Sequence, residues 1–230
     1  MRTSGGRIAA LAAVCAAAAV AVGVSGCGYL NDHHVEVDAT ITQQVRALRI
    51  DNGAGQVVVH SGGTGGDIVV HRDIDYHSDH PPTPGQAVTD GVLDLTANCD
   101  DCGIAYDVTV PSSLAVTITD NAGQVTVAGI AGTVDVTAAA GEVEGKDLSA
   151  PSVRVQASAG AVHLAFTAPP NEVTAHSNAG EVTVAVPDGS YAVEASTNAG
   201  ARTVDVPNDP SATRHLKVSS NAGAVTVTST

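Results

Sequence analysis

Aromatic side chains are almost absent from this chain of 230 residues, which has no Trp, one Phe and four Tyr. Proteins that bind nucleic acids or sugars by stacking use aromatic platforms, and this chain has too few to build one. Basic residues are also scarce, because 10 Lys and Arg stand against 24 Asp and Glu, for a formal net charge of −14. This acidity argues against DNA, RNA or anionic lipid head groups as partners. We therefore expect no nucleic-acid partner.

Catalytic motifs are missing as well. The chain contains no GxSxG nucleophile elbow and no HExxH metalloprotease motif. The glycines within residues 53–55 and 62–66 precede no helical pattern, so they do not predict a phosphate-binding loop. The acids Glu142 and Glu144 fit the outward positions of an acidic strand. We expect no enzyme and no cofactor; an enzyme that acts on envelope polysaccharide through acidic residues is one alternative.

The chain does contain a tandem repeat, which fills its C-terminal half. The clearest copies read NAGQVTV from Asn121, NAGEVTV from Asn178 and NAGAVTV from Asn221. Alignment on the glycine gives steps of 18, 19, 20, 20 and 23 residues. A period of this length is typical of a stacked array. The aligned glycines are Gly123, Gly141, Gly160, Gly180, Gly200 and Gly223.

Apolar residues at alternate positions flank each glycine, which predicts two strands per repeat. Around Gly180 they are Val173 and Ala175 before the glycine, and Val182 and Val184 after it. This alternation places the apolar side chains on one face of each strand. Asn and Gly tolerate the left-handed backbone of a tight reversal, so NAG is expected to be a turn. The SAG and AAG copies keep the glycine, so the glycine is expected to be the residue that adopts the left-handed backbone of the turn.

The predicted fold class is all-β, a repeat β-solenoid of stacked two-strand coils of about 20 residues each. An antiparallel β meander, with each NAG as a hairpin loop, is the alternative. Charge favours the solenoid, because stacking places Asp135 above Arg154 and Glu194 above Lys217. Such pairs contribute roughly 0.2 to 1 kcal/mol each.

The predicted domain covers residues 37–230, irregular over 37–110 and regular over 111–230. An early copy of the repeat, DNGAGQV from Asp51, echoes the DNAGQV from Asp120 and indicates that the array begins before the regular part.

The N-terminus has the features of an export signal. Arg2 and Arg7 precede an apolar, alanine-rich run over residues 8–24. The VSGC segment that follows resembles the bacterial lipobox, in which signal peptidase II cuts before the cysteine and the thiol carries diacylglycerol. An uncleaved membrane helix is the alternative, but the 17-residue run is at the lower edge of a span.

By this resemblance, residues 1–26 are a lipoprotein signal peptide and Cys27 is the lipidation site. Residues 27–36 then form a polar tether, in which His33 and His34 are assigned no role. Acyl chains stabilise membrane attachment by about 0.8 kcal/mol per buried methylene. We expect the mature protein at the outer face of the cytoplasmic membrane.

The order of these features also resembles a known family. Lipobox, tether, an early DNGAGQVVV strand pair, a CxxC loop before YDVTVP and repeated AG-x-V-x-V units follow one another. This order is similar to a bacterial β-strand-repeat domain of unknown function, labelled a putative adhesin. The resemblance covers essentially the whole mature chain and implies a repeat fold without catalytic residues.

Cys99 and Cys102 are the thiols that remain once Cys15 leaves with the signal peptide and Cys27 is lipidated. Outside the membrane they are expected to form a local disulfide, worth on the order of 2 kcal/mol. A redox CxxC needs a helix after its first cysteine, whereas GIAYDVTV predicts a strand. Half a zinc site needs two further ligands, and there is no second CxxC.

The densest group of metal-ligand residue types is HRDIDYHSDH, residues 71–80. In a strand, His71, Asp73 and Asp75 share one face, where a metal site can be built. A polar outward face followed by a loop explains the same residues, so no metal site is predicted, and His71, His77 and His80 are only candidates. Calcium is disfavoured, because the repeats lack the aspartate of GGxGxD.

Together these patterns predict a non-catalytic cell-surface lipoprotein that presents an acidic β-solenoid as an interaction or adhesin-like surface. The expected partners are the membrane, through the lipid anchor, and another envelope protein or a cell-wall polymer. The alternative from another class is a metal-binding or sensing envelope domain that uses residues 71–80.

Overall fold

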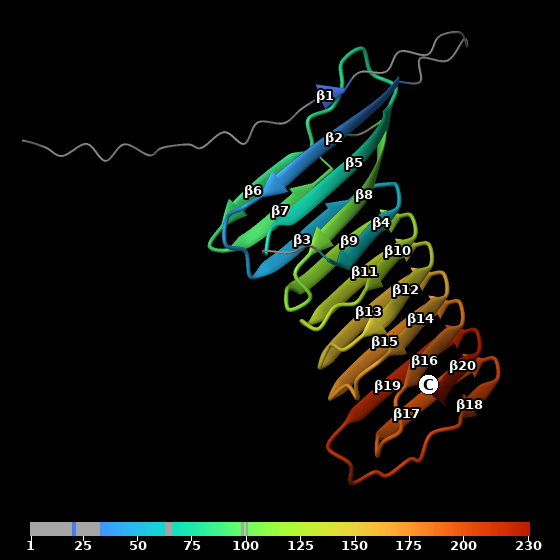
Figure 1. Ribbon diagram of the computed structural model, residues 1–230. Coiled ribbons are helices and arrows are strands. Elements are labelled where there is room, and N and C mark those ends of the chain that lie inside the picture. Colours follow the sequence, from blue (N-terminus) through green and yellow to red (C-terminus); the bar gives the residue numbers. More distant parts are fainter. Residues whose placement is uncertain (1–19, 22–32, 63–65, 98, 100) are drawn as a thin grey trace, which may run out of the picture.

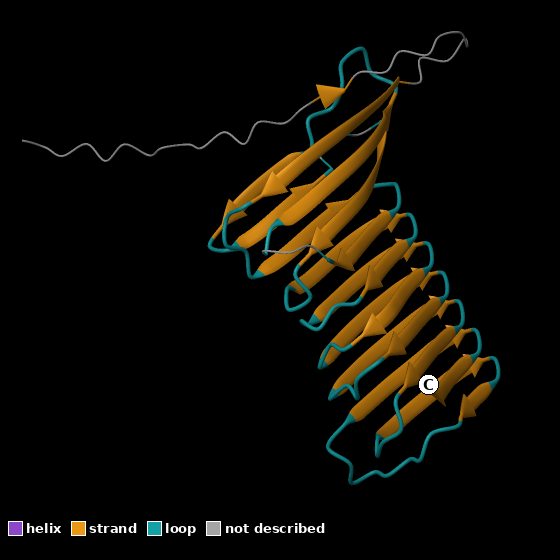
Figure 2. Cartoon of the chain, in the orientation of Figure 1, coloured by secondary structure: helices purple, strands orange, loops and turns teal. Residues whose placement is uncertain are grey.

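The computed structural model describes residues 20–21, 33–62, 66–97, 99 and 101–230; Cys27 lies outside them. Two long β-sheets pack face to face, and the described residues contain no helix (Figures 1 and 2). Consequently no helix that could span a membrane is present in this part of the chain. The prediction of an all-β fold is confirmed.

Sheet A has eleven strands. In spatial order they are β1 (Val20–Ala21), β2 (His33–Ile41), β5 (Ile68–Tyr76), β8 (Cys102–Val110), β4 (Val57–Ser61), β10 (Val125–Ala128), β12 (Val143–Leu148), β14 (Val162–Phe166), β16 (Val182–Val186), β20 (Val225–Ser229) and β18 (Arg202–Val204).

Sheet B has nine strands. In spatial order they are β17 (Ala192–Ala199), β19 (His215–Ala222), β15 (Glu172–Ala179), β13 (Ser152–Ala159), β11 (Val134–Ala140), β9 (Ala115–Ala122), β3 (Ala47–Asn52), β7 (Val92–Thr96) and β6 (Gly85–Thr89).

The strands of the repeat array pair in parallel, which confirms the solenoid and rules out the meander there. Each coil gives one strand to sheet B and, after the glycine turn, one to sheet A (Figure 1). Asp135 is the register partner of Arg154, and Glu194 that of Lys217, as predicted. The early copy is a true coil, since β3 and β4 pair in parallel with β9 and β10.

The core lies between the sheets and consists mainly of the alternate valines of each strand. Val125, Val143, Val162, Val182 and Val225 form one such row in sheet A, each at most 1% exposed. Small β-branched side chains suit this thin interior because they fill a narrow space between two pleated surfaces. A coil buries its apolar face only against its neighbours, so the array is stable only as a stack.

The repeat glycines stack into a ladder along one edge of the molecule, where the short turns follow one another (Figure 2). Gly141 and Gly160 have φ of 133° and 136°, a backbone that L-residues rarely adopt. A Cβ on either residue would also overlap the carbonyl oxygen of the glycine one coil before it. The Gly141 amide donates to Ala159 O at 2.9 Å, which ties adjacent turns together. The turn therefore requires glycine on two grounds, as the SAG and AAG copies suggested.

The last two repeats do not stack in the order of the sequence. The final pair, β19 and β20, lies between β15/β16 and the preceding pair, β17/β18, which ends the array. The spatial order of the coils therefore differs from their order in the sequence at this end. Arg202 gives the physical reason, because it occupies the register position of Val225 in a core-facing row. A guanidinium buried between two coils is costly, whereas at the end of the stack it remains exposed.

Side chains cover the open edge of this last coil. Asn208 accepts a hydrogen bond from Val193 N at 3.0 Å and donates one to Val193 O at 3.3 Å, as a neighbouring strand would. Arg202 Nε donates to Ala195 O at 2.8 Å. Unpaired strand edges attract other strands, and these contacts satisfy part of the edge within the chain itself.

A row of positions beside the glycine ladder is polar at both ends of the array. Its hydroxyls each donate to the turn carbonyl of the preceding coil, as Ser177 Oγ does to Gly160 O at 2.9 Å. In spatial order the row is Asn52, Asp120, Ala138, Ala157, Ser177, Ser220 and Thr197.

Asp120 is the one carboxyl group in this row, and it is only 1% exposed. Burial raises its pKa to about 6, and the hydrogen bond that Asn52 Nδ2 donates to Asp120 Oδ1, at 3.0 Å, works in the opposite direction. Asp120 Oδ2 has no hydrogen-bond partner in the structure. Burial of the charged form of Asp120 therefore destabilises the folded protein.

The N-terminal end of the molecule is built differently, because β2, β5 and β8 pair antiparallel and continue sheet A beyond the coils. β6 and β7 pair antiparallel at the same end of sheet B. The strand predicted for GIAYDVTV, residues 103–110, is confirmed as part of β8.

The boundary of the predicted tether is corrected by this end of the fold. β2 begins at His33, so residues 33–36 belong to the sheet and not to a tether. The physical reason is alternation, because Val35 and Val37 point inward and the intervening polar residues outward. β1, inside the predicted signal peptide, pairs with Glu36 and Val37, and cleavage before Cys27 would remove it.

Candidate functional site

The outer face of β2 and β5 carries the densest group of ionisable side chains that the structure brings together. Antiparallel pairing places His34 opposite Asp75 and Glu36 opposite Asp73. Because alternate residues of a strand share a face, His34, Glu36, Asp73 and Asp75 all point outward here. We call His34, Asp73 and Asp75 the HDD cluster; each offers one ligand atom, and these atoms lie within 4.8 Å of one another.

The HDD cluster is tight. His34 Nδ1 lies 3.0 Å from Asp75 Oδ1 and 3.0 Å from Asp73 Oδ1. Glu36 Oε1 lies farther away, 3.9 Å from His34 Nε2. The hydrogen bond with Asp75 raises the pKa of His34, and the charges of Asp73, Asp75 and Glu36 act in the same direction. The side chains of His34 and Asp73 are about half exposed, at 49% and 43%, so the cluster lies at the surface, although Asp73 Oδ1 itself is screened from solvent.

Two simpler pairs lie on the same face. His71 Nδ1 is 2.7 Å from Asp38 Oδ1, and this hydrogen bond raises the pKa of His71. His60 Nε2 is 2.9 Å from Asp107 Oδ1. Each pair joins one imidazole to one carboxylate, so the HDD cluster differs from both by its second carboxylate.

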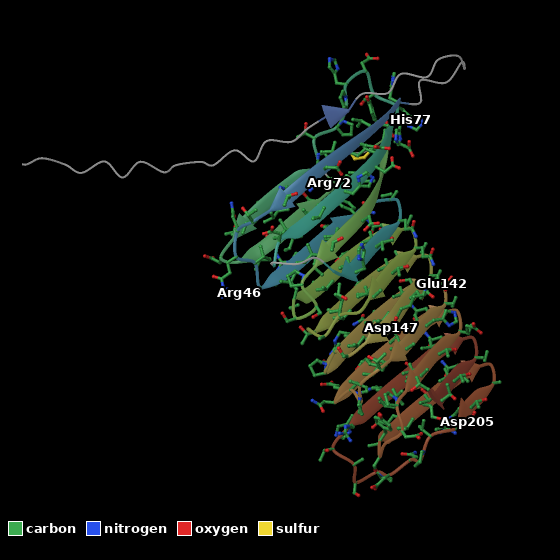
Figure 3. All side chains as sticks on the ribbon, in the orientation of Figure 1. Arg46, Arg72, His77, Glu142, Asp147 and Asp205 are labelled. Atoms are coloured by element: carbon green, nitrogen blue, oxygen red, sulfur yellow. A yellow bond between two sulfur atoms is a disulfide. The ribbon has the colours of Figure 1, made fainter. Side chains whose placement is uncertain are left out.

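The candidates named from the sequence are therefore only partly brought together. His71, Asp73 and Asp75 share one face of β5, as predicted, but His71 pairs with Asp38 instead of joining the two aspartates. His77 and His80 follow the end of β5 and are exposed (His77 is labelled in Figure 3). The sequence reasoning missed His34, because residues 27–36 were assigned to a tether. The alternation of HHVEVDATI was the signal that could have placed it in a strand.

Of the predicted cysteine sites, the structure describes Cys99 and Cys102 but not Cys27. Cys99 and Cys102 are joined in the structure with their Cα atoms 5.8 Å apart, a separation that a disulfide spans. Formation of that bond in the exported protein stays a prediction. Cys27 lies outside the described residues, so its lipidation stays a prediction too.

Arg72 explains how the N-terminal strands hold to the rest of the fold. Its side chain is 3% exposed and enters the space between the sheets from β5 (Figure 3). Its guanidinium donates to Gln86 Oε1 on β6 at 2.6 Å and lies over the Tyr106 ring, 5.7 Å from its centroid. Burial lowers the pKa of Arg72. This contact joins sheet A to sheet B beneath the face that carries the HDD cluster.

The neighbouring acids Glu142 and Glu144 make separate contacts. Glu144 forms an ion pair with Lys146, with 2.8 Å between Oε2 and Nζ. Glu142, labelled in Figure 3, lies at the turn before β12, and its Oε1 is 3.9 Å from His163 Nε2.

The repeat architecture agrees with a family model, Toastrack DUF4097, that matches residues 106–229 and hence more than half of the chain. The chain belongs to the Toastrack DUF4097 family. This confirms the predicted resemblance to a β-strand-repeat domain of unknown function. The Toastrack match begins within β8 and covers the coils from β9 onward, whereas the HDD cluster on β2 and β5 lies before it.

Solved structures also match this Toastrack protein. One is a putative cell adhesion protein from Clostridium sporogenes, 12% identical with a TM-score of 0.49, aligned over 84% of this chain and 99% of that one. Another is a putative adhesin from Bacteroides fragilis, 17% identical with a TM-score of 0.44, aligned over 85% of this chain and 97% of that one. Similarity at this level carries no function across. No curated protein matches the chain.

Proposed function

We propose that the protein is a non-catalytic surface lipoprotein, anchored through Cys27 at the outer face of the cytoplasmic membrane, whose solenoid presents an interaction surface. The partner is another envelope protein or a wall polymer. The proposal draws on the sequence for export and anchoring, and on the fold for the surface.

The observation that carries the proposal is the register of the outward side chains. On sheet B, one outward row runs through Asp94, Arg49, Thr117, Asp135, Arg154, Thr174, Lys217 and Glu194. Such rows hold polar groups at the fixed spacing of adjacent strands, about 4.8 Å. A rigid surface of this kind loses little conformational entropy when a partner binds.

Acidity supports the same function. Removal of residues 1–26 takes away Arg2 and Arg7 and no acid, so 24 acids stand against 8 bases and the charge of the mature chain becomes −16. A strongly charged surface steers oppositely charged partners and disfavours anionic ones. A basic protein or a cationic group on a wall polymer is therefore the expected partner chemistry.

Site-specific photo-crosslinking in living cells tests the surface. A photoreactive residue replaces Thr117 or Thr174 on sheet B, and in a matched control it replaces Ser113, outside the strands. We expect discrete covalent adducts from the sheet positions, lost when Asp135 and Glu194, acids of the same outward row, are both changed to Lys. Adducts of equal yield from all three positions, or none from the sheet, would contradict a specific interaction surface.

A further inference from the structure

We propose that the HDD cluster binds one divalent transition-metal cation, for which Zn²⁺ is the probe. The ligands are His34 Nδ1 from β2 and one carboxylate oxygen each from Asp73 and Asp75 on β5. This site goes beyond the proposed function, and it does not depend on the lipid anchor or on a protein partner.

The distances fit a bound ion. First-row divalent cations hold nitrogen and oxygen ligands at about 2.0–2.2 Å, so neighbouring ligand atoms lie about 3 Å apart. His34 Nδ1 is 3.0 Å from an oxygen of each aspartate, and all three ligand atoms lie within 4.8 Å of one another. Three ligands in this arrangement leave further coordination positions for water, because the cluster faces solvent.

The donor set selects the class of ion. Imidazole nitrogen suits Zn²⁺ and its neighbours in the transition series, whereas Ca²⁺ and Mg²⁺ prefer sites made of oxygen alone. One imidazole with two carboxylates also places two negative charges next to the ion, which offsets its own charge. The cluster is therefore expected to prefer Zn²⁺ over Ca²⁺.

A separate observation is that one carboxylate oxygen of the cluster lacks a hydrogen-bond donor. Asp73 Oδ1 is screened from solvent and has no hydrogen-bond partner, although it lies 3.0 Å from His34 Nδ1. His34 Nδ1 can carry only one hydrogen, and its hydrogen bond is with Asp75 Oδ1. A buried acceptor left without a donor costs free energy, and a cation on Asp73 Oδ1 removes that cost.

The backbone holds the ligands in place before any ion arrives. β5 lies between β2 and β8 in an antiparallel ladder, so both aspartates sit on a paired strand with neighbours on each side. On β2, the His33 ring stacks on Tyr76 with centroids 5.2 Å apart, which fixes the strand next to His34. Preorganised ligands bind more tightly, because less motion is lost on binding.

The test uses the full-length protein with a tag that contains no histidine, stripped with EDTA and desalted, and titrated with ZnCl₂ by calorimetry. We expect one equivalent of Zn²⁺ to bind, and affinity to fall about tenfold or more in His34→Ala and in Asp73→Asn. Asp38→Asn is the matched control, since it removes a carboxylate from the same face but outside the cluster. Its affinity should stay within about twofold of the wild type.

Three results would overturn the proposal. One is a wild type that binds no Zn²⁺ beyond the His34→Ala variant. Another is an equal loss in Asp38→Asn and Asp73→Asn, which would indicate general attraction to an acidic face. The third is displacement of Zn²⁺ by an equal concentration of Ca²⁺. Circular dichroism checks that the variants fold, and Cys27→Ser should bind Zn²⁺ like the wild type, so failure of anchoring is distinguishable from failure of this site.

Discussion

The repeat array and the N-terminal end use the same two sheets for different purposes. In the array, each coil repeats one set of contacts, with valine rows inside and a glycine ladder along the turn edge. At the N-terminal end, long antiparallel strands bring together residues far apart in sequence, such as His34 and Asp75. The repeat array therefore provides a rigid, regular framework. The HDD cluster lies in the N-terminal end, which is not made of repeats.

The largest loss of stability is expected from a substitution in the glycine ladder of the repeat array. Gly160→Ala adds a Cβ that overlaps the Gly141 carbonyl at a φ of 136°, and the two penalties together should cost roughly 2–6 kcal/mol. Gly53→Ala is the matched control, because no atom lies within 4 Å of its added Cβ. Urea unfolding should show a large loss for the first variant and little change for the second. Similar losses of stability in both variants would show that the ladder does not specifically require glycine.

The next effect lies where the two regions join, at Asp120. Its folded-state pKa, about 6, exceeds the ordinary aspartate value of 3.8, so the folded state holds the proton more tightly. The contribution of this group to stability is therefore present at low pH and lost as the pH rises from about 4 to about 6. Asp120→Ser, which copies Ser177, should gain up to about 3 kcal/mol at pH 7 and little below pH 4.

Unfolding measured from pH 4 to pH 7 checks this prediction. Asp135→Ser, on the outer face, serves as the control and should change stability only slightly at any pH in the range. A gain in Asp120→Ser that is the same at pH 4 and pH 7 would show that the charge of Asp120 is not the cause.

A smaller effect is expected at the far end of the array, where Asn208 covers Val193. Asn208→Ala removes two backbone hydrogen bonds that water partly replaces, so the cost should be about 1 kcal/mol. Amide exchange at Val193 should accelerate accordingly. Asn198→Ala, which removes one exposed contact with Asn221, should leave that amide unchanged. Equal protection of Val193 in both variants would show that Asn208 does not act as a cap.

The smallest effect is expected at the exposed ion pair between Arg49 and Asp94, whose Nη1 and Oδ1 atoms are 3.0 Å apart. Asp94→Asn should cost less than about 1 kcal/mol, and the cost should vanish in high salt because exposed pairs are screened. Unfolding at two salt concentrations measures this. A loss that persists unchanged in high salt would mean that Asp94 acts through packing instead.

Much of the array could be predicted from sequence, because its signals are local. The alternating valines around Gly180 and the retained turn glycines predicted both strands and the parallel stack. The order of the last coils could not be predicted from period alone, although Arg202, in place of a core valine, was the residue that marked the end coil. A repeat that carries a charge at a core position belongs at an edge.

The cluster was harder to predict because it depends on long-range pairing. Asp73 and Asp75 were recognised as neighbours on one face, since strand alternation is a local property. Their partner His34 lies 39 residues before Asp73, and nothing local indicates that β2 pairs with β5. His77 and His80 were near in sequence but lie beyond the end of β5, so sequence proximity misled there.

The most direct test of the proposed function is the intact mass and membrane fractionation of the wild type beside Cys27→Ser, in a bacterium that processes lipoproteins. The account predicts a wild type cut before Cys27, heavier by one diacylglycerol and found in membranes, and a variant that is unprocessed or released. Equal mass and equal distribution of the two proteins, apart from the substitution itself, would contradict a lipid anchor at Cys27.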